Sequence, residues 1–345
     1  MSTRLPTFGD LKVQEVKGML FDKRLLTGSV LFVALALYPG LTMNAYHSRL
    51  LAWVMCFAIA ALGFNVVLGY TGLLSFGHAA FFGTGMYTVV IAMETAGITD
   101  LIVLLVLATL TAGVVGAIIG ALSVKTHEIY FALLTLALAQ LLYVLAARDI
   151  GGLTRGTDGI ALNRPDFLGI PIGEAPAHIY LMGFYYHVIL VCLFATIVVL
   201  WIVLRSSFGL TLKMIRENET RAEMSGVPIL RYRLYSMILS AMIVGLGGAL
   251  YAVVVGHITP EYLDWTMSGE IVFMALLGGI GTFLGPIIGA GGFILLQEVA
   301  LSFTTYWHFT MGLVLFVVVL TLREKGIWGG AKALADRIND RREKS

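Results

Sequence analysis

The chain has 345 residues, of which 58% are hydrophobic and only 13% charged, and its net charge is +2. Ordinary soluble domains carry roughly 25% charged residues, so this composition excludes that class and predicts an integral membrane protein surrounded by lipid. The charge distribution gives no sign of a nucleic-acid partner. Cys56 and Cys192 lie in apolar runs without metal-site spacing, which predicts no disulfide framework, no metal and two buried, inert thiols.

Apolar runs recur along the chain at the length of membrane spans, which is about 20 residues for ~30 Å of hydrocarbon. We expect an all-α polytopic bundle of about ten transmembrane helices, two of them short or broken. Eight spans with re-entrant segments near 269–301 would fit the same charges. The ten runs lie at approximately 25–43, 49–70, 76–96, 101–123, 129–147, 179–204, 234–256, 269–282, 285–301 and 304–322.

Lysine and arginine gather before the first run, after the sixth and after the last, and short loops with positive charge stay in the cytoplasm. An even number of spans places all three clusters on that side. We therefore expect a cytoplasmic segment 1–24, a transmembrane domain 25–322 with a cytoplasmic loop 205–233, and a cytoplasmic tail 323–345. Residues 8–21 have one apolar and one charged side, which fits a helix on the membrane surface or a floppy tail. A cleaved signal peptide is disfavoured, because the leader is long and no small-residue cleavage pattern follows.

The stretch "GYTGLLSFGHAAFFGTGMYT" at 69–88 combines several glycines with one histidine inside an apolar region. Irregular backbone survives in a membrane only when it is buried in protein or lines a water-filled cavity, although ordinary helix packing also uses small residues. An ionisable residue at membrane depth suggests a function, against the alternative of a neutral histidine bonded to a carbonyl. Our candidates for lining a transport route are Tyr70, His78, Phe81, Phe82, Gly83 and Met86.

A second glycine-rich stretch, "MALLGGIGTFLGPIIGAGG" at 274–292, echoes part of the first. Interrupted segments at corresponding places in two halves of a transporter point to the pathway between them. We therefore add Gly278 and Gly281 to the pathway candidates.

The stretch 204–233, "LRSSFGLTLKMIRENETRAEMSGVPILRYR", is rich in charge in a chain that mostly avoids it. Its apolar and charged residues alternate in a way that predicts a short amphipathic helix, closed by Ser225-Gly226 and stopped by Pro228. A helix of this kind is suited to a groove on another protein.

Glu219, Arg221, Ala222 and Gly226 resemble the docking loop of ATP-binding-cassette importer permeases, with Arg221 where an alanine is usual. Together with the two glycine-rich stretches and "GGLTRGTDGI" at 151–160, the chain resembles the permeases of the branched-chain amino acid importer family, LivM-like members in particular, over roughly 50–322. The resemblance implies a docking role for Arg216, Glu219, Arg221, Ala222 and Gly226.

The family resemblance also implies the partners: a second, LivH-like permease, two cytoplasmic ATPase subunits and a periplasmic substrate-binding protein at a bacterial inner membrane. The sequence itself does not distinguish this heterodimer of permeases from a homodimer. Leucine, isoleucine and valine are the implied cargo, with urea, short amides or aromatic acids as alternatives. The long loop 148–178 lies on the outer side by the charge count, and its candidate contacts to the binding protein are Arg148, Arg155, Asp158 and Arg164. A tether that makes no contact is the alternative.

No complete G-x-x-x-x-G-K-[ST] phosphate loop exists in the sequence, since Gly151 to Gly156 is followed by Thr157 and Asp158. We therefore expect no cofactor on this chain, with ATP and Mg²⁺ on partner subunits. His127-Glu128 lacks the second histidine of a zinc helix, so the sequence predicts a transporter and not an enzyme. An ion-coupled secondary transporter is the competing class, and it would need membrane-embedded acids. The acids near apolar runs are Glu94, Glu270 and Glu298.

Overall fold

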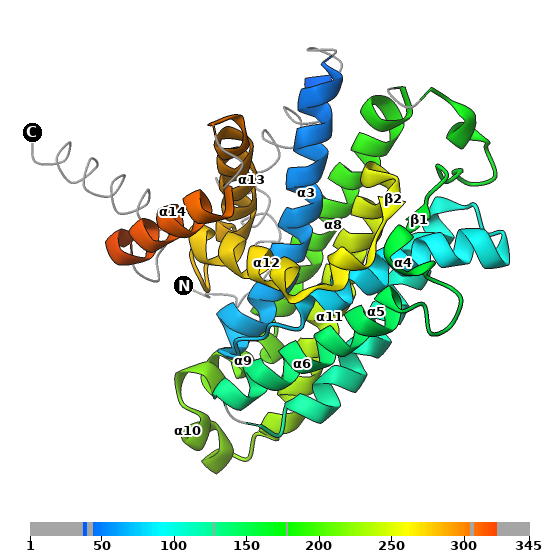
Figure 1. Cartoon of the computed structure of the whole chain (residues 1–345). Coiled ribbons are helices and arrows are strands. Elements are labelled where there is room, and N and C mark those ends of the chain that lie inside the picture. The colour runs from blue at the N-terminus through cyan, green and yellow to red at the C-terminus, as the bar shows by residue number, and fades with distance from the viewer. Residues whose placement is uncertain (1–36, 40–43, 127, 177–178, 304–306, 323–345) are drawn as a thin grey trace, which may run out of the picture.

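The protein is a bundle of long helices packed side by side, with a two-stranded sheet near one end (Figure 1). The computed structural model describes residues 37–39, 44–126, 128–176, 179–303 and 307–322. The helices are α3 Ala45–Asn65, α4 His78–Ala96, α5 Leu101–Ser123, α6 Glu128–Ala147, α8 Tyr186–Arg205, α9 Ser207–Glu217, α10 Glu219–Met224, α11 Ile229–Val255, α12 Trp265–Gly278, α13 Gly285–Phe303 and α14 Trp307–Leu322. The π-helical segments Val66–Thr71 and Tyr180–Tyr185 adjoin α3 and α8, short 3₁₀ turns lie at Gly156–Asp158, Ile172–Glu174 and Pro260–Leu263, and β1 Ile160–Ala161 pairs antiparallel with β2 His257–Ile258.

Seven of the described helical segments are long and apolar enough to cross a bilayer, and α12 is a shorter apolar helix. The prediction of an all-α, multi-pass membrane protein is therefore confirmed. Each expected run from 49–70 onward falls on a described helix. The run 25–43 lies mostly outside the described residues, as do the segment 1–24 and the tail 323–345, so the total of ten stays a prediction. Of the two free cysteines, Cys56 is buried and Cys192 half-buried.

Helix α11 is the centre of the bundle and packs against α3, α4 and α5. The packing is close because glycines face backbone: a methyl group on Gly85 or on Gly248 would collide with the main chain of Gly245 or Phe82. Lipid does not drive apolar helices together, so membrane helices associate through such contacts between small residues. Many glycines of the sequence therefore have a packing role within this one chain.

Helices α12 and α13 form a hairpin whose turn contains Gly279 and Gly281, both with positive φ. Helix α13 runs antiparallel to α3, because Asn65 at the end of α3 binds the main chain of Gly281 and Tyr46 at its start binds Glu298. Helix α13 therefore extends as deep as α3, and it counts among the seven span-length helices, whereas α12 is shorter. This depth favours a complete α13 over a shallow re-entrant segment.

The bundle has two ends with different structures. One end, which we call the α9–α10 end, carries α9, α10, the π-helical segment Val66–Thr71 and the α12–α13 turn. The opposite end, the β end, carries β1, β2 and the loop 148–178 (Figure 1). The loop expected in the cytoplasm and the loop expected outside thus lie at opposite ends of the bundle.

Candidate functional site

The segment between α8 and α11 folds into two helices where the sequence predicted one short helix. Asn218 has an extended backbone (φ −161°) and separates α9 from α10. Its side-chain oxygen accepts a hydrogen bond from the main-chain N–H of Arg221 (2.9 Å), which caps the start of α10. The break therefore comes from an N-cap residue placed inside the amphipathic pattern.

Helix α10 is held in a fixed shape by its own ends. The N–H of Gly226 donates to the carbonyl of Glu223 (2.9 Å) and that of Val227 to Ala222 (3.2 Å), which is the pattern of a Schellman motif. Gly226 has φ +80°, which a residue with a side chain rarely adopts. Ala222 is fully buried against Ile215 and Ile229. Ala222 therefore anchors α10 by its buried contacts, and Gly226 ends the helix by its positive φ.

Glu219 forms an ion pair with Arg233 at 2.7 Å, and the arginine is buried near the start of α11. The exposed residues of α10 are Thr220, Arg221, Glu223 and Met224, and Met224 is 85% exposed. Sequence reasoning did not select Met224. The sequence signal that could have identified it is an apolar methionine among the polar residues of this helix.

Arg216 is an exposed residue whose guanidinium end reaches back to its own bundle. Its guanidinium donates a hydrogen bond to the main-chain carbonyl of Gly69. One turn earlier in α9, the ammonium of Lys213 lies 5.5 Å from the centre of the Tyr70 ring, within cation–π distance. The loop is thus attached to the first glycine-rich stretch.

The side chains predicted to line a route are buried within this chain. His78, Phe81, Phe82 and Met86 are each 0% exposed, and Tyr70 is 6% exposed. The Nε2 atom of His78 lies 2.9 Å from the hydroxyl of Ser240, and that hydroxyl donates to the carbonyl of Gly63. In this conformation His78, Phe81, Phe82 and Met86 pack the junction of α3, α4 and α11, while Tyr70 lies in the π-helical segment beside α9. The part of all five in transport stays a prediction.

The pathway glycines also lie at close contacts. A methyl on Gly83 would come within 2.6 Å of Cγ of Leu263, and one on Gly278 would meet the main chain of Gly285. A methyl on Gly281 would lie 2.6 Å from the guanidinium of Arg216. Because Arg216 also binds Gly69, the structure brings the two glycine-rich stretches together at the α9–α10 end.

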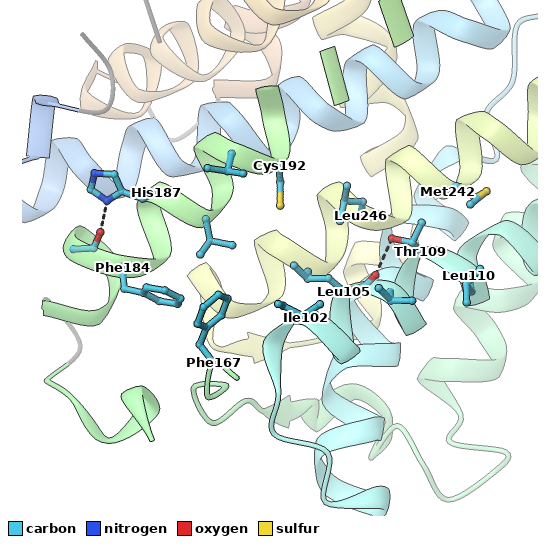
Figure 2. A pocket seen from close by; sticks show the side chains of 14 residues that line it. Ile102, Leu105, Thr109, Leu110, Phe167, Phe184, His187, Cys192, Met242 and Leu246 are labelled. Carbon is cyan, nitrogen blue, oxygen red and sulfur yellow. Dashed lines mark hydrogen bonds between the residues drawn. The ribbon is translucent and has the colours of Figure 1, made fainter. Parts of the chain in front are cut away.

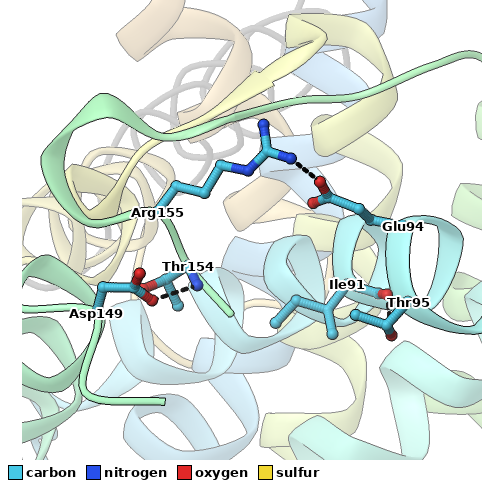
Figure 3. A network of polar contacts seen from close by, with 6 residues as sticks. All are labelled: Ile91, Glu94, Thr95, Asp149, Thr154 and Arg155. Carbon is cyan, nitrogen blue, oxygen red and sulfur yellow. Dashed lines mark hydrogen bonds and ion pairs between the residues drawn. The ribbon is translucent and has the colours of Figure 1, made fainter. Parts of the chain in front are cut away.

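The loop 148–178 at the β end is folded onto the bundle. Arg155 forms an ion pair with Glu94 at the end of α4 (Figure 3). Main-chain and side-chain hydrogen bonds from Thr154 to Asp149 lower the pKa of this carboxyl from its ordinary value. The loop therefore has a defined conformation around 149–155.

Of the other candidates in this loop, Arg164 donates to the carbonyl of Ala175 and so closes the loop on itself. Arg148 and Asp158 are exposed, and the described part of the chain shows no side-chain partner for either. These two side chains are available for an external contact, and Arg155 and Arg164 are already engaged.

A cavity of about 860 Å³ lies between α5, α8 and α11, and none of the pathway candidates lines it. Phe167 from the loop 148–178 stacks edge-to-face on Phe184 along its border (Figure 2). The lining is apolar apart from Thr109 and His187. An amino acid bound there would leave its ammonium and carboxylate without charged partners, which is costly away from water. This cavity is therefore a poor site for a zwitterion.

Comparison with known proteins decides the family. The model of the family "Branched-chain amino acid transport system / permease component" matches residues 46–320. The chain belongs to this family. The permease is similar to the high-affinity branched-chain amino acid transport system permease protein LivM of Salmonella typhimurium, with 24% identity over 90% of this chain and 76% of the relative.

The permease also resembles LivM of Escherichia coli, with 26% identity over 79% of this chain and 68% of the relative. The permease protein LivH of Salmonella typhimurium is 26% identical over 79% of this chain and 91% of the relative. No solved structure matches. The resemblance predicted from the motifs is confirmed, and membership makes this permease a transport component.

Proposed function

We propose that this chain is one of two membrane subunits of an ATP-driven, high-affinity importer for branched-chain amino acids. The observation that carries the proposal is the family match over 46–320, which includes every described membrane span. Similarity to relatives named LivM and LivH supports a second, LivH-like permease as the partner, since both names denote permeases of a branched-chain amino acid transport system.

ATP hydrolysis takes place on two separate ATPase subunits in this proposal, and the chain binds no cofactor and catalyses no reaction. The full sequence has no complete phosphate-binding loop. Helix α10 docks in a groove of one ATPase, with Met224 as an apolar anchor and Arg221 beside it. Glu219, Ala222 and Gly226 fix the shape of the docking helix, as their ion pair, burial and positive φ indicate.

The route for substrate runs between the two permeases, beside the stretch 69–86 and the turn at 278–281. Phe81, Phe82 and Met86 give an apolar surface, with Tyr70 and His78 as polar edges, that tolerates the aliphatic side chains of leucine, isoleucine and valine. Since these side chains are buried in the present conformation, the route opens only when the junction of α3, α4 and α11 moves. Specificity against urea, short amides and aromatic acids resides in the binding protein.

The placement of two of the three candidate acids does not favour ion coupling, whereas the third, Glu270, is half-buried within α12. Glu94 lies in the last turn of α4 and pairs with Arg155, and Glu298 accepts a hydrogen bond from Tyr46 near the start of α3. Acids that take up and release coupling ions would instead sit in the pathway near mid-membrane.

The permease resides in a bacterial inner membrane with the α9–α10 end and both termini in the cytoplasm. The β end then faces the binding protein, which contacts Arg148 and Asp158. The concentration of positive charge in the α9–α10 loop supports this orientation.

The mass of the detergent-purified transporter tests this assembly. Native mass spectrometry should give one copy of this chain, one second permease and two ATPase subunits. A mass that corresponds to two copies of this chain would show that the permeases form a homodimer and not a heterodimer. Active uptake by a preparation without ATPase would overturn the proposed function.

A further inference from the structure

Arg216 occupies a space that exists because two distant segments both have glycine there. Its guanidinium donates to the carbonyl of Gly69, 147 positions earlier in the chain. A methyl on Gly281 would lie 2.6 Å from Nη1 of Arg216, and one on Gly72 would lie 3.0 Å from its Cγ. The side chain of this exposed arginine thus reaches between the two glycine-rich stretches.

The carbonyl that Arg216 binds needs a donor. Gly69 lies in the last residues of the π-helical segment Val66–Thr71, and carbonyls at a helix end have lost their intrahelical partners. A cation there also interacts favourably with the negative end of the helix dipole. Lys213, with its ammonium over the Tyr70 ring, adds a second cation from α9 at the same helix end.

The α12–α13 turn is held to the same place from the other side. Asn65 is 2% exposed, and its Nδ2 donates to the carbonyl of Thr282 (2.9 Å). Its Oδ1 accepts from the N–H of Gly281 (3.2 Å). Movement of α9 therefore cannot displace Arg216 without disturbing Gly69, and a shift of the Gly281 turn disturbs Asn65.

We propose that Arg216 is a positioning residue that transmits movement of α9 to the backbone of both interrupted segments, and that it does not contact the ATPase itself. This inference rests on the proposed function, in which α10 docks on the ATPase and the two segments border the route. Packed junctions of this kind switch between discrete arrangements because they deform little. The hydrogen bond from Arg216 to Gly69 is the link that a moving α9 would break or re-form.

A purely structural role makes a different prediction. If Arg216 only stabilises the folded protein, its loss lowers the melting temperature, the yield of complex and uptake together. If Arg216 transmits movement, its loss lowers the amount of leucine transported per ATP hydrolysed in complexes that are still assembled. The ratio of uptake to ATP hydrolysis therefore separates the two roles.

The test uses the complete transporter in proteoliposomes with its binding protein, labelled leucine and ATP. The variants are Arg216→Ala, Arg216→Lys and the control Lys125→Ala, which removes an exposed cation that follows α5 and has no described side-chain partner. We expect Arg216→Ala to lower uptake per ATP on the order of tenfold, within the range of coupling free energies between sites. Arg216→Lys keeps one charged donor but not the planar fork, so its ratio should fall between alanine and wild type. Lys125→Ala should match wild type.

An unchanged ratio in Arg216→Ala, or a loss of uptake that only follows a lower melting temperature and yield, would overturn the proposal. Wild-type vesicles that take up no leucine with ATP would instead overturn the proposed function, and this inference with it. Normal wild-type uptake with an unchanged Arg216→Ala ratio overturns the inference alone.

Discussion

Glu219 on α10 accepts a hydrogen bond from the guanidinium of Arg233 on α11 at 2.7 Å, across 14 positions of the chain. The side chain of Arg233 is 8% exposed and that of Glu219 is 41% exposed. The helix that we assign to ATPase docking is therefore fastened to a membrane-spanning helix by an ion pair that is closed to solvent on one side.

Removing the carboxylate should leave a buried cation without its partner. We expect Glu219→Ala to lower the free energy of unfolding by roughly 1–3 kcal/mol, the range for a hydrogen bond to a charged group with partial exposure of one partner. The measurement is the melting temperature of the purified complex. Glu223→Ala, which removes an exposed carboxylate from the same helix, is the matched control and should leave it unchanged. Equal melting temperatures for the two variants would show that the ion pair does not hold α10.

Met224 should anchor the ATPase because its side chain is 85% exposed at the end of α10. We expect Met224→Asp to weaken the affinity for the ATPase about tenfold, because it removes an apolar anchor and introduces a charge at the interface. Pull-down of the ATPase by the membrane subunits at several concentrations measures this. Thr220→Ala on the same helix is the control. Full retention of ATPase by Met224→Asp would place the contact elsewhere.

Close helix packing at Gly85 should tolerate no side chain. A methyl there would collide with the main chain of Gly245 on α11, and one on Gly269 in α12 would meet nothing within 4 Å. We expect Gly85→Ala to lower the yield of folded protein and its melting temperature by several degrees, roughly the effect of an overpacked core. Gly269→Ala should be neutral or stabilising by up to about 1 kcal/mol. Gel filtration in detergent and thermal unfolding measure these effects. Equal yields and melting temperatures for Gly85→Ala and Gly269→Ala would refute this packing.

Charge changes at the β end should separate loop folding from partner binding. Arg155 and Glu94 already pair with each other, so the double exchange Arg155→Glu with Glu94→Arg should keep the loop and the affinity for the binding protein. Arg148→Glu or Asp158→Arg should weaken that affinity, because these exposed side chains have no described partner in the chain. Binding to immobilised transporter measures both. Unchanged affinity in Arg148→Glu and Asp158→Arg would mean that the loop is a tether.

The spans and the family could be predicted from the sequence because both depend on local patterns. Hydropathy located the described apolar helices to within a few residues, but not α9 and α10. The glycine-rich and charged motifs indicated the family that the comparison confirms. The division of the charged loop at Asn218 was missed, because its capping bond competes with a continuous amphipathic pattern.

Side-chain direction in the candidate site could not be predicted. Arg216 occurs in a polar loop, where solvent or a partner protein is the usual neighbour, and its actual acceptor is a main-chain carbonyl far away in sequence. Carbonyls carry no sequence signal. Asn65, an amide within an apolar span, did carry one, since a polar side chain at that depth requires hydrogen-bond partners.

The central claim is that this permease carries branched-chain amino acids at the expense of ATP. The most direct measurement is uptake of labelled leucine into proteoliposomes that contain the complete transporter and its binding protein, with and without ATP. The account predicts accumulation that requires ATP, is reduced by unlabelled isoleucine and valine, and is insensitive to urea. Accumulation driven by an ion gradient without ATP, or competition by urea but not by isoleucine, would contradict it.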